Sequence, residues 1–243
     1  MVVFNDADID QAINGTVFGS FVATGQTCIA GTRLLVQEDI YEEFVARYVE
    51  KVKMIGIGDP QNPSTQMGPV INQGQLDKVS EFCNLGVQEG GKLLCGGKQP
   101  LGLGDEISNA YYWEPTVLGH CRPDMRVVRE EVFGPVVVAY SFKDEADAIA
   151  KANDSDFGLA ASVWSRDIKR GHRVADQLDV GIVWLNDHHR NDPSSPWGGM
   201  KDSGVGRENG LEALQEYTQT RSVVVGFDDT PFDWFVQGDA RYG

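Results

Sequence analysis

The stretch that decides the fold is Val136-Val137-Val138-Ala139-Tyr140-Ser141-Phe142, a nearly continuous apolar run of strand length. Behind it, a helical pattern at 144–153, a strand at 161–165, a helix at 167–178 and a strand at 181–186 alternate in order. Strands that alternate with helices of this length form βαβ units, in which the strands lie parallel. The sequence therefore predicts an α/β fold, a mainly parallel sheet flanked by helices.

The rest of the chain extends this pattern in both directions. No internal domain boundary is visible, so we expect one domain over 1–225 that ends on an edge strand, followed by a tail at 226–243 that packs on a surface. Apolar periodicity predicts helices at 8–23, 39–55, 72–89 and 208–216, strands at 33–37, 92–95 and 221–225, and an extended segment at 111–118.

Composition excludes several classes of function. The 243 residues carry a net charge of −15, which argues against nucleic acid or an anionic membrane as partner. No apolar run is long enough to span a bilayer, and the first residues lack the features of a signal peptide, so we expect a cytoplasmic protein. The four cysteines lie far apart without a CxxC pair, which predicts free thiols and no metal site: Cys28, Cys83, Cys95 and Cys121.

One of these cysteines stands in a distinctive loop, Gly25-Gln26-Thr27-Cys28-Ile29-Ala30-Gly31, between a predicted helix and a predicted strand. Glycines on both sides let the backbone bend sharply there. A junction with exposed backbone N–H groups favours the thiolate, which is the nucleophilic form of cysteine. A small buried thiol that only fills space is the alternative, and the local sequence leaves both interpretations open.

The long loop at 187–206 contains adjacent histidines, His188 and His189. A loop of this length usually has a functional role. Neighbouring histidines on a loop do not easily share a metal ion, so we interpret them as pocket-lining or exposed residues. We expect His120 and His172 to lie on the surface.

Parallel sheets usually bind their ligands at the carboxyl ends of the strands, and we expect the site there. The chain has no GxGxxG motif after a strand and no P-loop. The sequence alone therefore shows no complete cradle for a dinucleotide phosphate.

Four stretches together resemble the aldehyde dehydrogenase superfamily. They are the loop at 25–28, Glu-Glu-Val-Phe-Gly-Pro-Val at 130–136, the segment at 153–161 with Phe-Gly-Leu, and Pro-Trp-Gly-Gly-Met-Lys-Asp-Ser-Gly-Val-Gly-Arg-Glu at 196–208. Their order and spacing agree from about residue 4 to 225. The resemblance implies that residues 1–225 form an aldehyde dehydrogenase catalytic domain with a final edge strand.

The resemblance implies a role for individual residues. In the family, a cysteine thiolate attacks an aldehyde, hydride leaves to NAD or NADP, and water hydrolyses the thioester. Cys28 matches the nucleophile, Glu131 the residue that holds the nicotinamide ribose, and Phe133 the ring beside the nicotinamide. The residues implied for the substrate pocket are Thr27, Ile29, Asn186, His188, His189 and Trp197.

The resemblance also implies that parts of a complete site lie upstream of the matched region. In the family these are the cofactor domain, the glutamate that acts as general base, an asparagine of the oxyanion hole and the oligomerisation arm. Without the adenosine half of the site, much of the cofactor's binding energy is absent, so this chain is also compatible with no cofactor at all.

Three functions therefore stay open. The first is an oxidoreductase that converts a small-molecule aldehyde to its acid with NAD or NADP. The second is a cofactor-independent cysteine enzyme for acyl transfer, isomerisation or addition. The third is a non-catalytic binding domain. In each case an apolar face without its neighbouring domain predicts a homo-oligomer.

Overall fold

The computed structural model describes residues 1–104, 107, 110–227, 229, 234 and 235. Its centre is a seven-stranded sheet in the order β3-β4-β5-β2-β1-β7-β8. Every neighbouring pair is parallel except β3 with β4, which confirms the mainly parallel α/β fold. The strands are β1 Val2–Val3, β2 Arg33–Gln37, β3 Lys92–Cys95, β4 Thr116–Gly119, β5 Val136–Phe142, β7 Ala160–Trp164 and β8 Ile182–Leu185.

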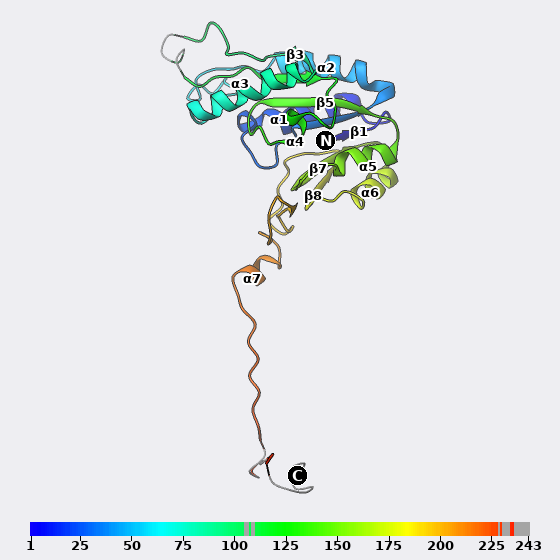
Figure 1. Cartoon of the computed structure of the whole chain (residues 1–243), viewed down its shortest axis with the longest axis vertical. Helices are drawn as coiled ribbons and strands as arrows, with labels where there is room; N and C mark the ends of the chain where they lie inside the picture. Colours follow the sequence, from blue (N-terminus) through cyan, green and yellow to red (C-terminus); the bar gives the residue numbers. More distant parts are fainter. Residues whose placement is uncertain (105–106, 108–109, 228, 230–233, 236–243) are drawn as a thin grey trace.

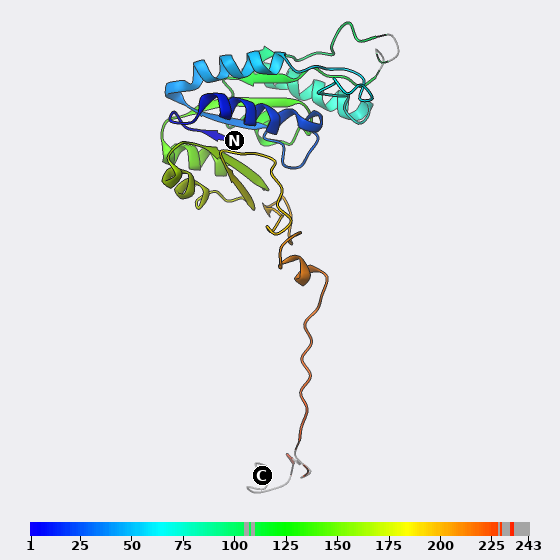
Figure 2. The ribbon, with the colours of Figure 1, turned by 180° about the vertical axis from the view of Figure 1, so that it is seen from behind.

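Helices cover both faces of this sheet. One face carries α1 (Ile9–Phe21) and α2 (Tyr41–Lys53), which lie in front in Figure 2, and the other carries α3 (Gln73–Gln88) and α5 (Glu145–Asn153), in front in Figure 1. Short segments complete the layers: η1 Val22–Gly25, η2 Glu38–Ile40, α4 Arg126–Arg129 and α6 Ile168–Ala175. Four helices begin at a side chain that accepts a backbone N–H, at Asp8, Asn72, Asp144 and Asp167.

Alternation along the strands divides the core into two layers. In β2, Leu34 and Val36 face α1 and α2, whereas Leu35 faces the opposite layer of helices. In β5, Val137 lies in the first layer and Val138 in the second. Because successive side chains of a strand point to opposite faces, a strand that is buried on both sides must be apolar throughout. For this reason the sequence at 136–142 is almost continuously apolar instead of alternating between apolar and polar residues.

The carboxyl-terminal part differs from the prediction. The helix expected at 208–216 is reduced to α7 (Ala213–Glu216), and residues 221–225 form no strand. Leu214 is 66% exposed and Val224 is 91% exposed, so neither segment buries an apolar face. A short helix or a single strand without such packing has little to stabilise it.

The packing of the tail at 226–243 stays a prediction. Phe227 and Phe235 are 92% and 93% exposed. The other residues of 226–243 on which this prediction depends lie mostly outside the described residues. Among the helices of the described residues, none combines the length and the apolar character that crossing a bilayer requires.

A second, two-stranded sheet joins two distant segments. β6 (Phe157–Gly158) pairs antiparallel with β9 (Met200–Lys201), with Phe157 opposite Lys201. The sequence did not predict this pairing, because two-residue strands have no periodicity to detect. It places the segment at 153–161 directly beside the glycine-rich run at 196–208.

The helix α1 determines which edge of the sheet carries the loop with the cysteine. The chain leaves β1 at its carboxyl end, runs back along the sheet through α1 and reaches β2 at the amino end. The loop that contains Cys28 precedes β2, and Glu131 and Phe133 precede β5. The expected position at the carboxyl ends is therefore wrong, because these loops lead into parallel strands rather than out of them.

The packing of α1 generates a stability prediction. A Cβ at Gly15 would lie 2.1 Å from the ring of the buried Trp164, whereas a Cβ at Gly74, in α3, would meet nothing closer than 3.5 Å. Alanine at a helical glycine normally stabilises by up to about 1 kcal/mol. We expect Gly74→Ala to show that gain and Gly15→Ala to destabilise by about 1–3 kcal/mol through overpacking. Urea unfolding of both variants measures the difference, and equal stability would contradict the described packing.

Candidate functional site

Cys28 lies in a tight turn at the end of η1. The backbone enters the turn through left-handed conformations at Ala23 (φ 50°), Thr24 (φ 61°) and Gly25 (φ 67°). The N–H of Ala30 donates to the carbonyl of Thr27 at 3.0 Å, so Cys28 occupies the second position of a β-turn. Non-glycine residues in this region cost free energy, so the strained junction that the sequence predicts is present.

Hydrogen bonds hold both sides of this turn. The Gly31 N–H donates to the carbonyl of Gly19 at 2.9 Å, and the Ser20 hydroxyl donates to the carbonyl of Gly31 at 2.9 Å. On the other side, the Gln26 side-chain oxygen accepts the N–H of Ile71 at 3.0 Å. The turn is therefore fixed to the end of α1 and to the loop that precedes α3.

A second loop approaches the turn closely. A Cβ at Gly25 would lie 2.4 Å from the carbonyl oxygen of Gly134, which leaves room only for glycine. Phe133 has a φ of 57°, and the Gln75 side-chain amide donates to the carbonyls of Val132 and Phe133 at 2.8 Å each. Gln75 thus anchors the loop that carries Glu131 and Phe133 beside Cys28.

Between these loops lies a cavity of about 360 Å³. It brings together six of the residues that the sequence singled out, namely Thr27, Cys28, Ile29, Glu131, Phe133 and His188. The sequence reasoning missed further lining residues of the same cavity: Arg33, Leu159, Asp202 and Ser203. Leu159, Asp202 and Ser203 lie within the motifs at 153–161 and 196–208, and membership of these motifs was the sequence signal that could have identified them. For Arg33, the first residue of a predicted strand, no sequence signal exists.

The two arginines that line the cavity are already engaged. Arg33 donates to the Tyr140 hydroxyl at 2.6 Å and to the backbone carbonyls of Lys151 and Ala152 at 2.6 and 3.3 Å. Arg129 forms an ion pair with Asp154 at 3.1 Å. Both guanidinium groups therefore serve the walls of the cavity rather than its interior.

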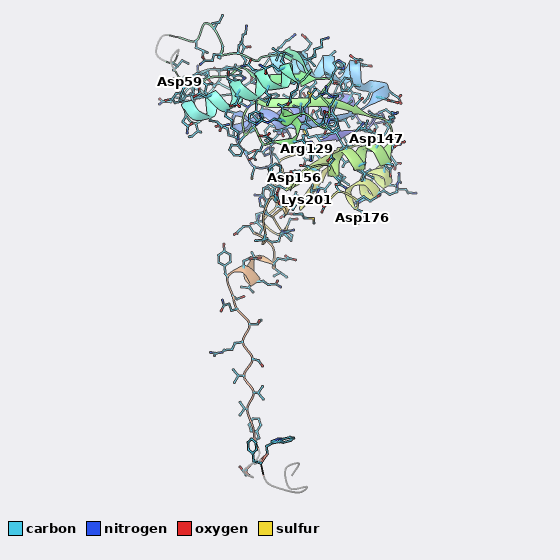
Figure 3. All side chains as sticks on the ribbon, in the orientation of Figure 1. Asp59, Arg129, Asp147, Asp156, Asp176 and Lys201 are labelled. Atoms are coloured by element: carbon cyan, nitrogen blue, oxygen red, sulfur yellow. The ribbon has the colours of Figure 1, made fainter. Side chains whose placement is uncertain are left out.

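The rim segment at 153–156 is held from two sides, by Arg129 and Lys201 (Figure 3). Arg129 pairs with Asp156 at 3.9 Å in addition to Asp154. The Lys201 ammonium donates to the carbonyls of Asn153 and Ser155 at 2.9 and 3.1 Å. These contacts fix the part of the cavity wall that contains Ser155.

His188 is buried behind the turn, with 4% of its surface exposed. Its Nε2 lies 2.9 Å from the carbonyl oxygen of Ile29, the residue that follows the cysteine. Burial lowers the pKa of this imidazole from 6.5 to about 4. The ring is therefore neutral at neutral pH.

The other predicted pocket residues lie around His188 rather than in the cavity lining. His189 Nε2 is 3.4 Å from the Thr27 hydroxyl, at the limit of a hydrogen bond. Asn186 exchanges two hydrogen bonds with the backbone of Ser165, at 2.9 and 2.8 Å. Trp197 forms an isolated bridge with Glu208. The pocket role of these three residues stays a prediction.

Aromatic rings form a continuous row beside the turn. The centroids of Phe18 and His189 are 5.7 Å apart, those of His189 and His188 5.2 Å, those of His188 and Trp184 4.8 Å, and those of Trp184 and Trp197 6.4 Å. Ring separations of this size are typical of favourable aromatic contacts. The inner rings of the row, Trp184 and His188, are 8% and 4% exposed, so the row packs behind the turn.

All four cysteines are free, and only Cys28 is exposed. Burial raises the pKa of Cys83 and Cys121 to about 12 and that of Cys95 to about 11, so these thiols stay protonated. Cys121, just after β4, is buried in the core. Within the described residues, no three His, Cys, Asp or Glu side chains lie close enough to hold a metal ion.

The fold and the cavity define a class of protein: a parallel α/β domain that presents one exposed thiol on a strained turn beside a cavity. A family model, described as the aldehyde dehydrogenase family, matches residues 1–223. The chain therefore belongs to the aldehyde dehydrogenase family, as the motifs indicated.

Individual relatives agree with this assignment. The chain is 46% identical over 234 residues to a betaine aldehyde dehydrogenase of Brucella anthropi and 44% identical to one of Brucella melitensis, covering 96% of this chain and 48% of each relative. The structure of betaine aldehyde dehydrogenase from Staphylococcus aureus in complex with NAD+ superposes with a TM-score of 0.94 at 39% identity, covering 97% of this chain and 46% of that one. The chain thus spans about half the length of the relatives it matches.

The buried histidine generates a pH prediction. Because the pKa of His188 is about 4 in the folded state and 6.5 as its ordinary value, the unfolded chain binds the proton first as the pH falls. Stability from this group is complete above pH 6.5 and is lost as the pH falls toward 4, by about 3 kcal/mol in total.

We expect the free energy of unfolding of His188→Phe to fall less between pH 6.5 and 4 than that of the wild type, by up to this amount. Urea titrations at several pH values measure it, with His172→Gln as a control that removes an exposed histidine. Parallel pH curves for the wild type and His188→Phe would contradict the burial of a neutral ring.

Proposed function

We propose that this chain performs the thiol chemistry of an aldehyde dehydrogenase, with Cys28 as the nucleophile. The observation that carries the proposal is the exposed thiol, the one exposed cysteine of the four, in a cavity shared with Glu131 and Phe133. The thiolate sulfur adds to the aldehyde carbon and forms a thiohemiacetal, while the carbonyl oxygen takes up negative charge. The strained turn fixes the sulfur for this attack.

The Cys28 backbone supports stabilisation of that negative charge. Among the described residues, no backbone hydrogen-bond acceptor faces the N–H of Cys28. A free backbone donor next to a nucleophile suits an oxyanion. This single donor makes a partial oxyanion hole.

The lining of the cavity fits the nicotinamide end of NAD or NADP. Glu131 would accept hydrogen bonds from the ribose hydroxyls, and Phe133 would lie beside the ring. When bound, the cofactor supplies a hydride acceptor. The residues of this chain contribute the orientation of the thiol and the wall that Gln75 and Arg129 hold in place.

We further propose a small aldehyde with a cationic group as the substrate. The relatives are named betaine aldehyde dehydrogenases, and a trimethylammonium group is attracted to aromatic faces. Phe18, which is 53% exposed, and the half-buried His189, which lies next to Thr27, offer such faces beside the turn. The net charge of −15 favours the approach of a cation as well.

A cofactor-independent reaction at Cys28 is the second candidate. The cavity beside Cys28 is lined by residues of this chain, whereas the chain covers 46% of the Staphylococcus aureus enzyme whose structure contains NAD+. The thiol could then transfer an acyl group without any hydride acceptor.

An assay with NAD+, NADP+ and betaine aldehyde separates the candidates. We expect NADH absorbance that is lost in Cys28→Ser by at least about a hundredfold, since the nucleophile is removed. The neutral isostere 3,3-dimethylbutanal should react more slowly. Turnover of a thioester without NAD+, abolished by the same variant, would favour the second candidate. If Cys28→Ser changes neither reaction, both are excluded and a binding domain remains.

We also propose that the chain acts in a reducing compartment such as the cytoplasm. All four cysteines are free, and an exposed thiol such as Cys28 keeps its nucleophilic form only where it is not oxidised.

We propose that the chain forms a homo-oligomer through its carboxyl-terminal arm, defined here as residues 211–227. The arm extends away from the sheet in Figure 1, and Val223, Val224 and Val225 are 71%, 91% and 60% exposed. The edge strand β8 is short and apolar, without a lysine or proline to protect it. An exposed β-branched segment and an open apolar edge are complementary, and two copies can satisfy both.

Light scattering tests this proposal. We expect a mass above that of one chain for the wild type and a shift toward the monomer for Val224→Asp, because a charge on the arm opposes its burial. Gln99→Asp places the same charge on an exposed loop and should leave the mass unchanged. A monomeric wild type at every concentration would exclude the oligomer.

A further inference from the structure

The buried imidazole of His188 has an unusual arrangement of partners. Its Nε2 contacts the Ile29 carbonyl at 2.9 Å, and its Nδ1 is buried without any hydrogen-bond partner among the described residues. A carbonyl oxygen only accepts, so Nε2 carries the proton and Nδ1 is a bare acceptor in the neutral ring. The hydrogen bond to Ile29 therefore determines the tautomer of the ring.

The packing around this ring leaves it little freedom. On one side, a Cβ at Gly19 would lie 2.5 Å from His188 Cδ2, so the helix backbone touches the imidazole directly. On another side, the ring of Trp184 has its centroid 4.8 Å away. Because helix and indole confine the ring, its Nε2–H points at one fixed place, the third residue of the cysteine turn.

A buried acceptor without a partner destabilises a fold, and packing alone would be served better by an apolar ring. The polar ring must therefore contribute something that an apolar ring cannot. Its hydrogen bond goes to the backbone next to Cys28. The hydrogen bond within the turn, from the Ala30 N–H to the Thr27 carbonyl, encloses Cys28 and Ile29.

We infer that His188 is a positioning residue for the nucleophile: its Nε2–H fixes the Ile29 carbonyl and thereby the turn that presents Cys28. This role adds to the place of His188 in the cavity lining, where only 4% of its surface is exposed. The inference deepens the proposed function and rests on it, since positioning matters only if Cys28 reacts.

Hydrogen exchange of the turn amides tests the inference directly. In His188→Phe the Ile29 carbonyl loses its donor, and we expect the amides of Ala30 and Gly31 to exchange about tenfold faster, as for the loss of one hydrogen bond. His188→Gln places an amide N–H close to the position of Nε2 and should restore slow exchange. His188→Asn, whose amide reaches only the position of Nδ1, should not restore it.

Gly19→Ala provides a route that keeps the histidine. The added methyl group displaces the ring from its seat, so this variant should also accelerate exchange at residues 30 and 31. Thermal unfolding identifies any variant that has lost its fold. A purely structural role predicts equal exchange in His188→Gln and His188→Asn. That result, or exchange at the wild-type rate in both His188→Phe and Gly19→Ala, would overturn the inference.

The outcome is independent of the activity assay. The proposed function fails if turnover survives in Cys28→Ser. The inference fails if the exchange rates of the Ala30 and Gly31 amides do not depend on the hydrogen-bond donor at position 188. If both hold, the exchange rates and the turnover of the Gln and Asn variants should rank in opposite order, the more protected turn giving the faster reaction.

Discussion

The structure depends on the requirement that consecutive parallel strands are joined by a chain segment that crosses from one end of the sheet to the other. Helix α1 makes this crossing between β1 and β2, and it can do so because Ala12, Ile13 and Val17 bury against the face that Leu34 and Val36 present. After this crossing the chain is at the amino edge of the sheet, and one loop connects the end of η1 to the start of β2. The cysteine turn is that loop, so the exposed position of the Cys28 thiol is a direct product of the topology.

The neighbouring loops meet the turn for the same reason. The loop before β5 reaches the same edge, and the contact between Gly25 and the Gly134 carbonyl brings the two loops so close that a side chain cannot come between them. Gln75, from the helix α3 on the opposite layer, then fixes the second loop. Two helices from opposite faces of the sheet therefore determine the relative position of Cys28 and Phe133.

The layered architecture and most elements around 136–186 could be predicted from the sequence, because buried parallel strands are apolar throughout and the helices between them are periodic. Cys28, Glu131 and Phe133 were recognisable from motifs. The edge of the sheet was predicted wrongly, since a general tendency of parallel sheets was applied to loops that lead into strands. The segment at 221–225 has strand composition without a partner strand, and local composition carries no information about partners.

The network around His188 was beyond the reach of sequence reasoning for a different reason. Two adjacent histidines on a loop have no periodicity, and their burial depends on the approach of Gly19 and Trp184 from elements far away in the chain. The same holds for Arg33, whose guanidinium is occupied by partners that no local pattern reveals.

The charged side chains that line the cavity would affect the release of a product. Oxidation of an aldehyde would convert an uncharged carbonyl into a carboxylate within the cavity. Glu131 and Asp202 line the same space. Arg129 is paired with Asp154, whereas the hydrogen-bond partners of Arg33 among the described residues are uncharged oxygens. A carboxylate formed in the cavity would therefore be attracted by Arg33 and repelled by Glu131 and Asp202, so the release of a product would depend on the balance between these charges.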